Sequence, residues 1–523
     1  MFSFGGQHRH QSISIAQDQF WKKVPQWKHV STEEFTSYRF QLRHTVHKAK
    51  LCNFLGEALP DRLAPSANPL LQKIRTKSDF IKDVLEGLEL APMAIRLTPH
   101  LLARVNWEQA LDDPIRMQFI PLRSALLPDI PGLTLDSLHE EADSPVPGLV
   151  HRYPGRALFI TTSICPVYCR FCTRSRAVGP NTDTVLKAPQ KPSRTRWELV
   201  FEYIEKNESI HDIVVSGGDA YYLQPEQLKE IGERLLSIKH IQRFRFGSKG
   251  LAVAPGRITD RDDAWASTLI DISNQGRRLG KQVSLHTHFN HPEEINWITR
   301  DAANHLYAHG VVVRNQSVLL KGVNDDHETM GELLNKLAGI NIQPYYVYQC
   351  DLVRGIEDLR TPLDTILNMD KHIRGTLSGF MTPSFVVDLP GGGGKRLCST
   401  YESYHKGIAK YRAPGLPGEK GRKEYTYYDP DPNAVENELR IRQHQHEEDV
   451  ATIPAEAVMS AGAFIPAEVT LPSEAAIPAR ASLSSRAAPP SDIPIPSEAL
   501  NTMLQPPPDT ITMYEKQAAS GGY

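Results

Sequence analysis

The sequence has few cysteines, no long apolar run and no excess charge of either sign. Only six cysteines occur in 523 residues, which is too few for a disulfide-stabilised scaffold and fits a reducing compartment. No run of about 18 apolar residues exists, and Met1 to Val30 lack the apolar stretch of a secretory signal. The 59 basic and 61 acidic side chains give a formal charge of −2, which argues against a nucleic-acid partner. We therefore expect a cytoplasmic protein without membrane or nucleic-acid partners, with a mitochondrial presequence as the alternative.

The composition changes along the chain. Residues 451–523 are rich in Pro, Ala and Ser and lack Trp and Cys, so they cannot bury enough apolar surface to offset the entropy of ordering. A disordered tail is expected there, and a linker or partner-binding segment is the weaker alternative. The expected regions are a flexible N-terminus (1–25), a helical accessory layer (26–150), a core barrel (151–380), a C-terminal segment (381–432) and the disordered tail (433–523).

Between about Val150 and Asp388, short β-type runs alternate with amphipathic helical stretches. This alternation predicts parallel βα units, hence an α/β fold with either an open doubly wound sheet or a barrel. In both architectures ligands bind beyond the carboxyl ends of the strands. The predicted strands are Ala157–Thr161, Ile213–Ser216, Arg243–Gly247, Val283–Thr287, Val311–Val313, Tyr345–Tyr348 and Phe385–Asp388, and the predicted helices include Trp197–Lys206, Pro225–Ile238, Glu293–His309 and Glu328–Ala338.

Three cysteines lie together just after the first of these strands, in Cys165-Pro-Val-Tyr-Cys169-Arg-Phe-Cys172. Thiolates at this spacing in one loop can surround a single inorganic centre, and buried cysteines without a ligand would rarely cluster so closely. A structural zinc ion needs four ligands, and no fourth Cys or His lies at a finger-like distance. An iron–sulfur cube held by three thiolates leaves one iron open to a small molecule. The spacing therefore favours a [4Fe–4S] cluster.

This CxxxCxxC loop resembles that of the radical S-adenosylmethionine (radical SAM) superfamily, whose fold is an open, partial βα barrel. The resemblance implies that the open iron chelates S-adenosylmethionine and that an electron from the cluster cleaves it to a 5′-deoxyadenosyl radical. It also implies a role for the string at the end of the next strand, which contacts the methionine part of the cofactor in this superfamily. Alone, Gly217-Gly218 would indicate an ordinary turn. Beside the cysteine loop, we expect this string at the cofactor site; its residues are Ser216, Gly217, Gly218 and Asp219.

A second unusual string is Asp388-Leu-Pro-Gly-Gly-Gly-Gly-Lys395. A phosphate-binding P-loop would need glycine at Leu389 and Ser or Thr at Arg396, so that motif is absent. A flexible linker is one interpretation. Another is that the glycines let one lysine reach a crowded centre, where shielding from water lowers its pKa and makes it a nucleophile able to form a Schiff base with pyridoxal phosphate.

Several strings, in family order, resemble lysine 2,3-aminomutase over roughly Trp27 to Pro430. They are Cys165–Cys172 with Thr173-Arg174, Asp143-Ser-Pro-Val-Pro-Gly-Leu-Val-His-Arg-Tyr-Pro154, Thr287-His-Phe-Asn-His-Pro292, Asn315-Gln-Ser317, Tyr348-Gln-Cys-Asp351 and Asp388–Lys395. The resemblance implies that Lys395 anchors pyridoxal 5′-phosphate. By the same resemblance, Arg152, Tyr153 and Arg156 help to hold this cofactor, and His288 and Gln316 lie near S-adenosylmethionine.

The same resemblance bears on the substrate. In the lysine enzymes, the aspartates matching Asp351 and Asp388 receive the distant ammonium of lysine, and the arginine matching Arg174 holds its α-carboxylate. The chemistry agrees, because a guanidinium fork suits a carboxylate and a buried ammonium needs opposite charge. We therefore expect an isomerase that interconverts L-lysine and β-lysine. Arginine or another amino acid is the alternative substrate, as is a lysine on a translation factor.

Two readings from other classes compete. His286-Thr-His288-Phe-Asn-His291 would suit a zinc-dependent barrel hydrolase, but it leaves the cysteine loop and Lys395 without a use. An interaction protein with a dead site is disfavoured, because every site residue named above is intact, although Lys249 and Arg314 stand where better-known members of the family have Arg and Gly. The family chemistry implies an electron donor such as a flavodoxin or ferredoxin. A homo-oligomer is possible. The cysteine-rich zinc motif that bacterial lysine aminomutases often carry near the C-terminus does not follow Cys398, so an intersubunit zinc and a tetramer are doubtful.

Overall fold

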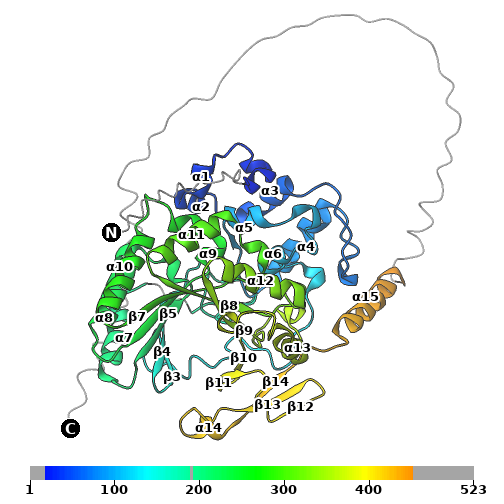
Figure 1. Ribbon diagram of the computed structural model, residues 1–523. Coiled ribbons are helices and arrows are strands. Elements are labelled where there is room, and N and C mark those ends of the chain that lie inside the picture. Colours follow the sequence, from blue (N-terminus) through cyan, green and yellow to red (C-terminus); the bar gives the residue numbers. More distant parts are fainter. Residues whose placement is uncertain (1–17, 189–191, 452–523) are drawn as a thin grey trace, which may run out of the picture. The chain divides into compact units, whose positions relative to one another are not determined.

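The computed structural model describes residues 18–188 and 192–451, which form a curved nine-stranded sheet with helices packed around it (Figure 1). The sheet order is β11-β10-β9-β8-β7-β6-β5-β4-β3, so neighbours in the sheet are also neighbours in the chain. Parallel pairing runs without interruption from β4 to β10. These strands are β4 (Arg156–Thr162), β5 (Asp212–Gly217), β6 (Arg243–Gly247), β7 (Gln282–Thr287), β8 (Val312–Val318), β9 (Ile342–Tyr348) and β10 (Ser384–Leu389).

Helices connect the parallel strands, as the crossover of a βα unit requires. Several begin at a polar cap: the Ser193 hydroxyl accepts from the Arg196 amide, and Asp326 accepts from the Thr329 amide. Figure 1 shows α7, α8 and α10 on the outer face of the sheet. The crossover helices are α7 (Arg194–Lys206), α8 (Pro225–Ser237), α9 (Gly250–Val253), α10 (Trp265–Arg278), α11 (Trp297–Ala308), α12 (His327–Gly339) and α13 (Leu363–Ile373). The prediction of an open βα barrel is confirmed.

The two ends of the sheet are antiparallel strands. β3 (Leu149–Tyr153) pairs with β4, and β11 (Gly394–Leu397) pairs with β10. Side chains bring these ends together, because the Lys395 amide donates to the Tyr153 hydroxyl at 2.7 Å. Gly394 has φ +70°, and a Cβ there would collide with the Tyr153 hydroxyl. Glycine at this position therefore permits the contact.

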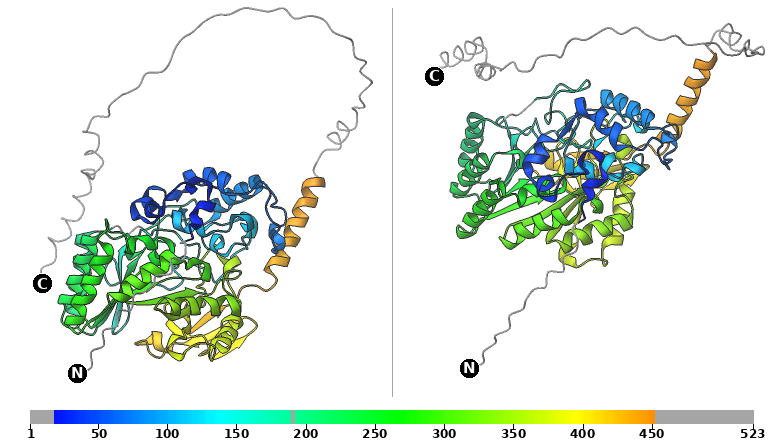
Figure 2. Two further views of the ribbon diagram at one scale, coloured as in Figure 1. Left: turned by 45° about the horizontal axis from the view of Figure 1, so that its top comes forward. Right: turned by 90° about the horizontal axis from the view of Figure 1, so that it is seen from above.

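The segment before the barrel is mainly helical, as expected. It covers one side of the barrel in all three views (Figures 1 and 2). One polar link is the Tyr38 amide, which donates to Asp260 at 2.7 Å. The elements are α1 (Thr32–Thr36), α2 (Tyr38–Arg43), β1 (Val46–His47), α3 (Lys48–Ala58), α4 (Lys77–Leu90), β2 (Arg96–Leu97), α5 (Pro99–Arg104) and α6 (Pro114–Phe119).

A small antiparallel sheet follows β11, and then a single helix. Residues 434–451 form helix α15, which corrects the expectation of an irregular tail from 433 onward. Pairs four residues apart support it, such as Glu436 with Arg440. The elements are β12 (Ser403–His405), β13 (Ile408–Arg412), α14 (Glu419–Arg422), β14 (Glu424–Tyr428) and α15 (Ala434–Ala451). The expected flexible N-terminus up to 17 and the rest of the tail lie outside the described residues. Among the described helices, none has both the length and the apolar character needed to cross a lipid bilayer.

Candidate active site

A cavity of about 390 Å³ lies at the carboxyl ends of the parallel strands and extends into the barrel. Every site residue predicted from the sequence lines it, although those residues come from eight separate segments of the chain. They are Arg152, Tyr153, Arg156, Cys165, Cys169, Cys172, Arg174, Ser216, Gly217, Gly218, Asp219, His288, Gln316, Asp351, Asp388 and Lys395. The fold thus brings the predicted residues together, while their individual roles stay predictions.

The cysteine loop leaves the end of β4 and turns back against the barrel. Arg170 fixes it from below, donating to both carboxylate oxygens of Asp358 at 2.8 and 2.9 Å. Phe171 stacks on the ring of His288, with centroids 5.7 Å apart. Burial raises the pKa of the Cys169 thiol to about 12, so ligation of a metal centre would displace a proton from it.

Within the described ranges, no three His, Cys, Asp or Glu side chains converge on one point as ligands of a single metal ion. This geometry disfavours the mononuclear zinc site of the hydrolase reading, in which His286, His288 and His291 would share an ion. A cube-shaped cluster contacts each thiolate through a different iron. All three cysteines of the loop line the same cavity, as the ligands of one cluster would, and their role as its ligands stays a prediction.

The glycines at the end of β5, Gly217 and Gly218, allow this loop to pack closely against the strand. Gly217 has φ +127°, and a Cβ on Gly218 would lie 2.6 Å from the backbone nitrogen of Ile164. Only glycine allows the two strand ends to touch in this way. The Asp219 carboxylate holds the next turns, accepting from the backbone amides of Tyr221 and Lys249 at 2.7 Å each.

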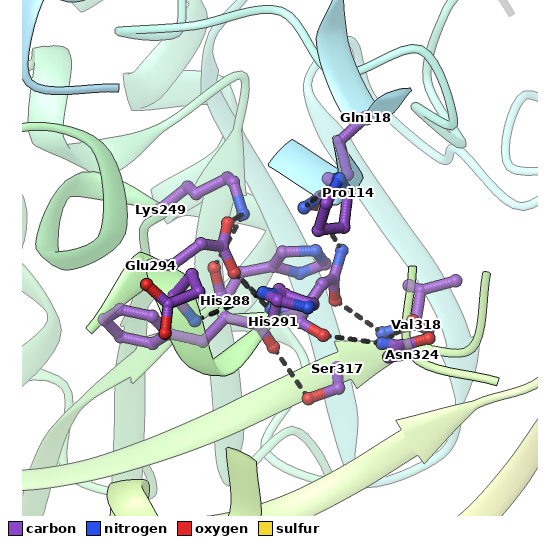
Figure 3. Close-up of polar contacts among 12 residues, drawn as sticks. Pro114, Gln118, Lys249, His288, His291, Glu294, Ser317, Val318 and Asn324 are labelled. Atoms are coloured by element: carbon purple, nitrogen blue, oxygen red, sulfur yellow. Dashed lines mark hydrogen bonds and ion pairs between the residues drawn. The ribbon is translucent and has the colours of Figure 1, made fainter. Parts of the chain in front are cut away.

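A buried polar network fixes the loop after β7 (Figure 3). Glu294 accepts from the Lys249 ammonium at 2.9 Å and from the His291 amide at 2.9 Å. The Lys249 ammonium also donates to the His288 carbonyl at 2.9 Å. From the other side, Asn324 donates to the Asn290 carbonyl at 2.7 Å. The backbone that carries His288 is thereby held on both sides.

Three polar side-chain atoms at the end of β7 are buried and have no hydrogen-bond partner among the described residues. They are His286 Nε2, Thr287 Oγ1 and His288 Nε2, and all three residues line the cavity. Burial, with the charge of Lys249, holds the pKa of His288 well below its usual value, so the imidazole is neutral. Buried polar atoms normally find partners. These orphaned atoms fit a polar ligand such as S-adenosylmethionine.

Lys395 is held by a carboxylate. Its ammonium lies 3.0 Å from Oδ2 and 3.3 Å from Oδ1 of Asp388, and 5.2 Å from the ring centroid of Tyr348. Burial acts to lower the pKa of Lys395, but the charge of Asp388 raises it above its usual value. This corrects the expectation of a lysine with a lowered pKa. To act as a nucleophile, Lys395 must first lose its proton, and Asp388 is positioned to receive it.

Asp351 sits beside this pair with one oxygen unused. The Thr173 hydroxyl donates to Oδ2 at 2.6 Å, whereas Oδ1 is buried and finds no partner among the described residues. Burial and the like charge of Asp388 raise the pKa of Asp351 to about 7. Asp351 and Asp388 thus place two carboxylates in one cavity, and one of their oxygens has no partner among the described residues.

Arg174 forms an ion pair with the buried carboxylate of Glu140, a partner that was not predicted from the sequence. It donates from Nε and Nη2 to Glu140 at 2.9 and 2.7 Å, and Arg176 donates to Glu140 at 3.2 Å. The side chain of Glu140 is only 4% exposed. This fork fixes the plane of the Arg174 guanidinium and does not use its Nη1 nitrogen.

Replacing Glu140 by Gln is expected to lower the free energy of unfolding by about 3 kcal/mol, because it leaves buried guanidinium charge uncompensated. The charges of Arg174 and Arg176 outweigh burial and hold the pKa of Glu140 below its usual value. The ionised Glu140 therefore stabilises the fold above a pH of about 4.5, and this contribution is lost as the pH falls. The free energy of unfolding of the Gln variant should accordingly fall less steeply than that of the native protein on the acid side. Denaturant unfolding across pH measures this.

The matched control is Glu293→Gln, which removes the exposed partner of Arg104. Exposed pairs contribute less than about 1 kcal/mol. An equal decrease in the free energy of unfolding in the two variants would show that the buried Glu140–Arg174 pair stabilises the fold no more than an exposed ion pair does.

The arginines at the end of β3 and the start of β4 differ in their partners. Arg152 donates to Asp143 at 2.6 Å, and Lys420 pairs with the same carboxylate. Arg156 lies over the Tyr153 ring at 3.8 Å, and no carboxylate pairs with it within residues 18–188 and 192–451. Arg156 is therefore a cation available to a phosphate. Asp143, like Glu140, escaped the sequence reading as a partner, because an acidic residue before the barrel carries no periodic or spacing signal.

No family model matches the sequence. The chain is 37% identical over 369 residues to the L-lysine 2,3-aminomutase of Acetoanaerobium sticklandii, covering 71% of this chain and 80% of that protein. It is 36% identical over 371 residues to the L-lysine 2,3-aminomutase of Clostridium subterminale, covering 71% and 79%. The glutamate 2,3-aminomutase of Clostridioides difficile is 33% identical over 363 residues, covering 69% and 76%.

Among solved structures, a radical SAM methyltransferase from Sphaerobacter thermophilus aligns with 16% identity and a TM-score of 0.28, covering 46% of this chain and 68% of that one. An open βα barrel with a CxxxCxxC loop after its first parallel strand, together with aminomutase relatives, defines a radical SAM isomerase. The chain belongs to the lysine 2,3-aminomutase family. A [4Fe–4S] cluster and S-adenosylmethionine are the cofactors that this membership implies.

Proposed function

We propose that the protein interconverts L-lysine and β-lysine. The observation that carries this proposal is the pair of carboxylates in the cavity, Asp351 and Asp388, next to the forked Arg174. Asp388 already binds an alkylammonium, that of Lys395, at 3.0 Å. The same two carboxylates suit the ε-ammonium of lysine, and Arg174 suits its α-carboxylate.

The charge of the site supports lysine over glutamate as the substrate. A glutamate side chain would bring a third carboxylate towards Asp351 and Asp388, and like charges in a buried site repel strongly. A lysine side chain brings the opposite charge.

The residues on the different walls of the cavity have different proposed roles. The proposed ligands of the cluster are Cys165, Cys169 and Cys172, and the cluster supplies the electron that cleaves S-adenosylmethionine. Its electron comes from a one-electron donor of the flavodoxin or ferredoxin type. The end of β7 and Gln316 face S-adenosylmethionine, and the buried network around Glu294 holds that wall in place.

Pyridoxal phosphate is the proposed third cofactor, and it supplies a π-system through which the migrating nitrogen passes. Lys395 would hold this cofactor covalently through Nζ, and Asp388 would accept the proton that the Lys395 ammonium has to lose first. The unpaired Arg156 would face its phosphate, while Arg152 and Tyr153 border the same site. The glycines before Lys395 bring its backbone within reach of Tyr153.

Borohydride reduction of the protein purified with pyridoxal phosphate is expected to fix the cofactor on Lys395, because its ammonium lies in the cavity beside Asp388. Lys249 also lines the cavity, but its ammonium is held by Glu294 and the His288 carbonyl. Peptide mapping by mass spectrometry locates the adduct. Lys395→Arg keeps the charge beside Asp388 and should give no adduct. A label on another lysine would contradict the assignment.

Arginine is the competing substrate, because a guanidinium also satisfies two carboxylates. Incubating the reduced enzyme with L-lysine, L-arginine and L-glutamate, and analysing each for its β-isomer, distinguishes them. We expect turnover of lysine, at a kcat/KM at least about tenfold above arginine, since one mismatched group is worth roughly 1–3 kcal/mol. If arginine is isomerised and lysine is not, the substrate is arginine and the proposed chemistry stands. If glutamate is isomerised, the argument from the charge of Asp351 and Asp388 is refuted.

A further inference from the structure

A buried lysine without a carboxylate partner lies beside the cysteine loop. Lys187 is 8% exposed, and its ammonium donates to the backbone carbonyls of Pro92 and Ser175. No carboxylate lies within ion-pair distance of it in the part of the chain that the structure describes. Other cations around the loop do have buried carboxylates: Arg170 has Asp358, Arg174 has Glu140 and Lys249 has Glu294.

The position of Lys187 relates it to the thiols. Its ammonium contacts the Met93 sulfur at 3.7 Å, and Met93 packs in one cluster with Tyr168 and Val178, against which Cys165 and Cys172 lie. One partner, Ser175, also donates its amide to the Cys172 carbonyl at 3.1 Å. Lys187 therefore stands one layer behind the cysteines, without touching them.

Burying an ammonium costs free energy unless an opposite charge compensates it. Carbonyl oxygens compensate only in part, and burial lowers the pKa of Lys187 to about 8 despite the opposing charge of Cys172. A cluster with three thiolate ligands is the anion that this position faces, and reduction adds one more negative charge to it. Charge close to a cluster is one of the levers that set its reduction potential.

We propose that Lys187 is a fixed counter-charge of the iron–sulfur cluster and raises its reduction potential. The proposal rests on the cluster assignment of the proposed function. By stabilising the reduced cluster, the ammonium eases the transfer of an electron from an external donor. It acts through the cluster, so Lys187 is a positioning residue and not a catalytic one.

The test is a redox titration of the cluster-loaded protein with dithionite and mediators, followed by electron paramagnetic resonance. Lys187→Gln keeps donors for the two carbonyls but removes the charge, Lys187→Met removes both, and Lys187→Arg keeps the charge. Gln and Met are expected to disfavour reduction about tenfold, equal to a 59 mV lower potential for a one-electron couple. Arg should stay within about a third of that shift.

The matched control is Lys281→Gln. Lys281 is also a partly buried lysine that donates to two backbone carbonyls, those of Leu236 and Ile238, at 2.8 and 2.6 Å. It precedes β7 and so lies at the opposite end of the strands from the cavity. Its variant should leave the potential unchanged.

An unchanged potential in Lys187→Gln, or an equally lowered one in Lys187→Arg or Lys281→Gln, would overturn the proposal. Iron content is measured on each variant. Loss of iron from both the Gln and the Met variants would also overturn it, in favour of a purely structural anchor. If the native protein itself binds no cluster, the proposed function fails first, so the two failures are distinguishable.

Discussion

Replacing Cys169 by Ala is expected to remove the iron–sulfur cluster and with it the cleavage of S-adenosylmethionine. Three thiolates are the whole of the protein's proposed ligand set, so two cannot retain the cube with one open iron. Mutation of residues that only support the ligands of a metal site lowers metal affinity or activity about 10–100-fold, and loss of a ligand itself should lower it more. Iron analysis, visible absorption and release of 5′-deoxyadenosine measure the outcome. Cys165→Ala and Cys172→Ala should behave alike.

The control is Cys52→Ala, which removes a half-buried thiol on α3, outside the cavity. Cys398, which is buried and also outside the cavity, is expected to be dispensable too. A full iron complement in the triple variant of the loop would rule out the cluster assignment.

Asp351→Asn and Asp388→Asn are expected to lower kcat/KM for lysine by about two to three and a half decades. Each leaves a buried substrate ammonium under-compensated, a penalty of about 3–5 kcal/mol. Asp388 also holds Lys395, so its variant should disturb cofactor anchoring as well. Asp351→Asn, which keeps the shape and the acceptor for Thr173, is the cleaner test of substrate charge.

Asp351 also predicts a pH dependence. Burial and the charge of Asp388 raise the pKa of Asp351 to about 7, with Lys395 acting to lower it and Glu140 to raise it. Below this pH the carboxyl is neutral and holds an ammonium poorly, so KM for lysine should fall as pH rises through about 7. The Asn variant should lose this limb while still cleaving S-adenosylmethionine. A variant that turns over lysine normally, or that loses cofactor cleavage equally, would contradict the role.

The parallel strands could be predicted because their β-branched and aromatic runs are buried from both sides. The prediction failed where the site imposes polar residues. β8 continues from Val312 to Val318 through Arg314, Asn315, Gln316 and Ser317, whereas the sequence predicted a strand ending at Val313. Polar side chains on the inner face of a barrel hide the strand signal. The edge strand β11 was not predicted either, because glycine and lysine have low strand propensity. The edge strand β3 was also missed, although its Val150 and Tyr153 favour a strand.

Within the site, motif order identified which residues meet, but not how they are paired. Nothing in the sequence shows that Glu140 grips Arg174 or that Asp143 grips Arg152, since both carboxylates come from the irregular segment before β3. The predicted direction of the pKa shift of Lys395 was wrong for the same reason. Burial was foreseen for this lysine, whereas the 3.0 Å approach of Asp388 depends on the antiparallel register of β10 and β11.

The contact between Tyr153 and Lys395 has a consequence for how the chain matures. The two residues are 242 positions apart, and they join the first and last strands of the sheet. During synthesis the cysteine loop is complete long before β11 leaves the ribosome. Closing so long a loop is slow and comes late in folding. The two halves of the cavity therefore form at different times, and a nascent chain completes its three-cysteine loop well before Lys395 can reach Tyr153 on the opposite wall.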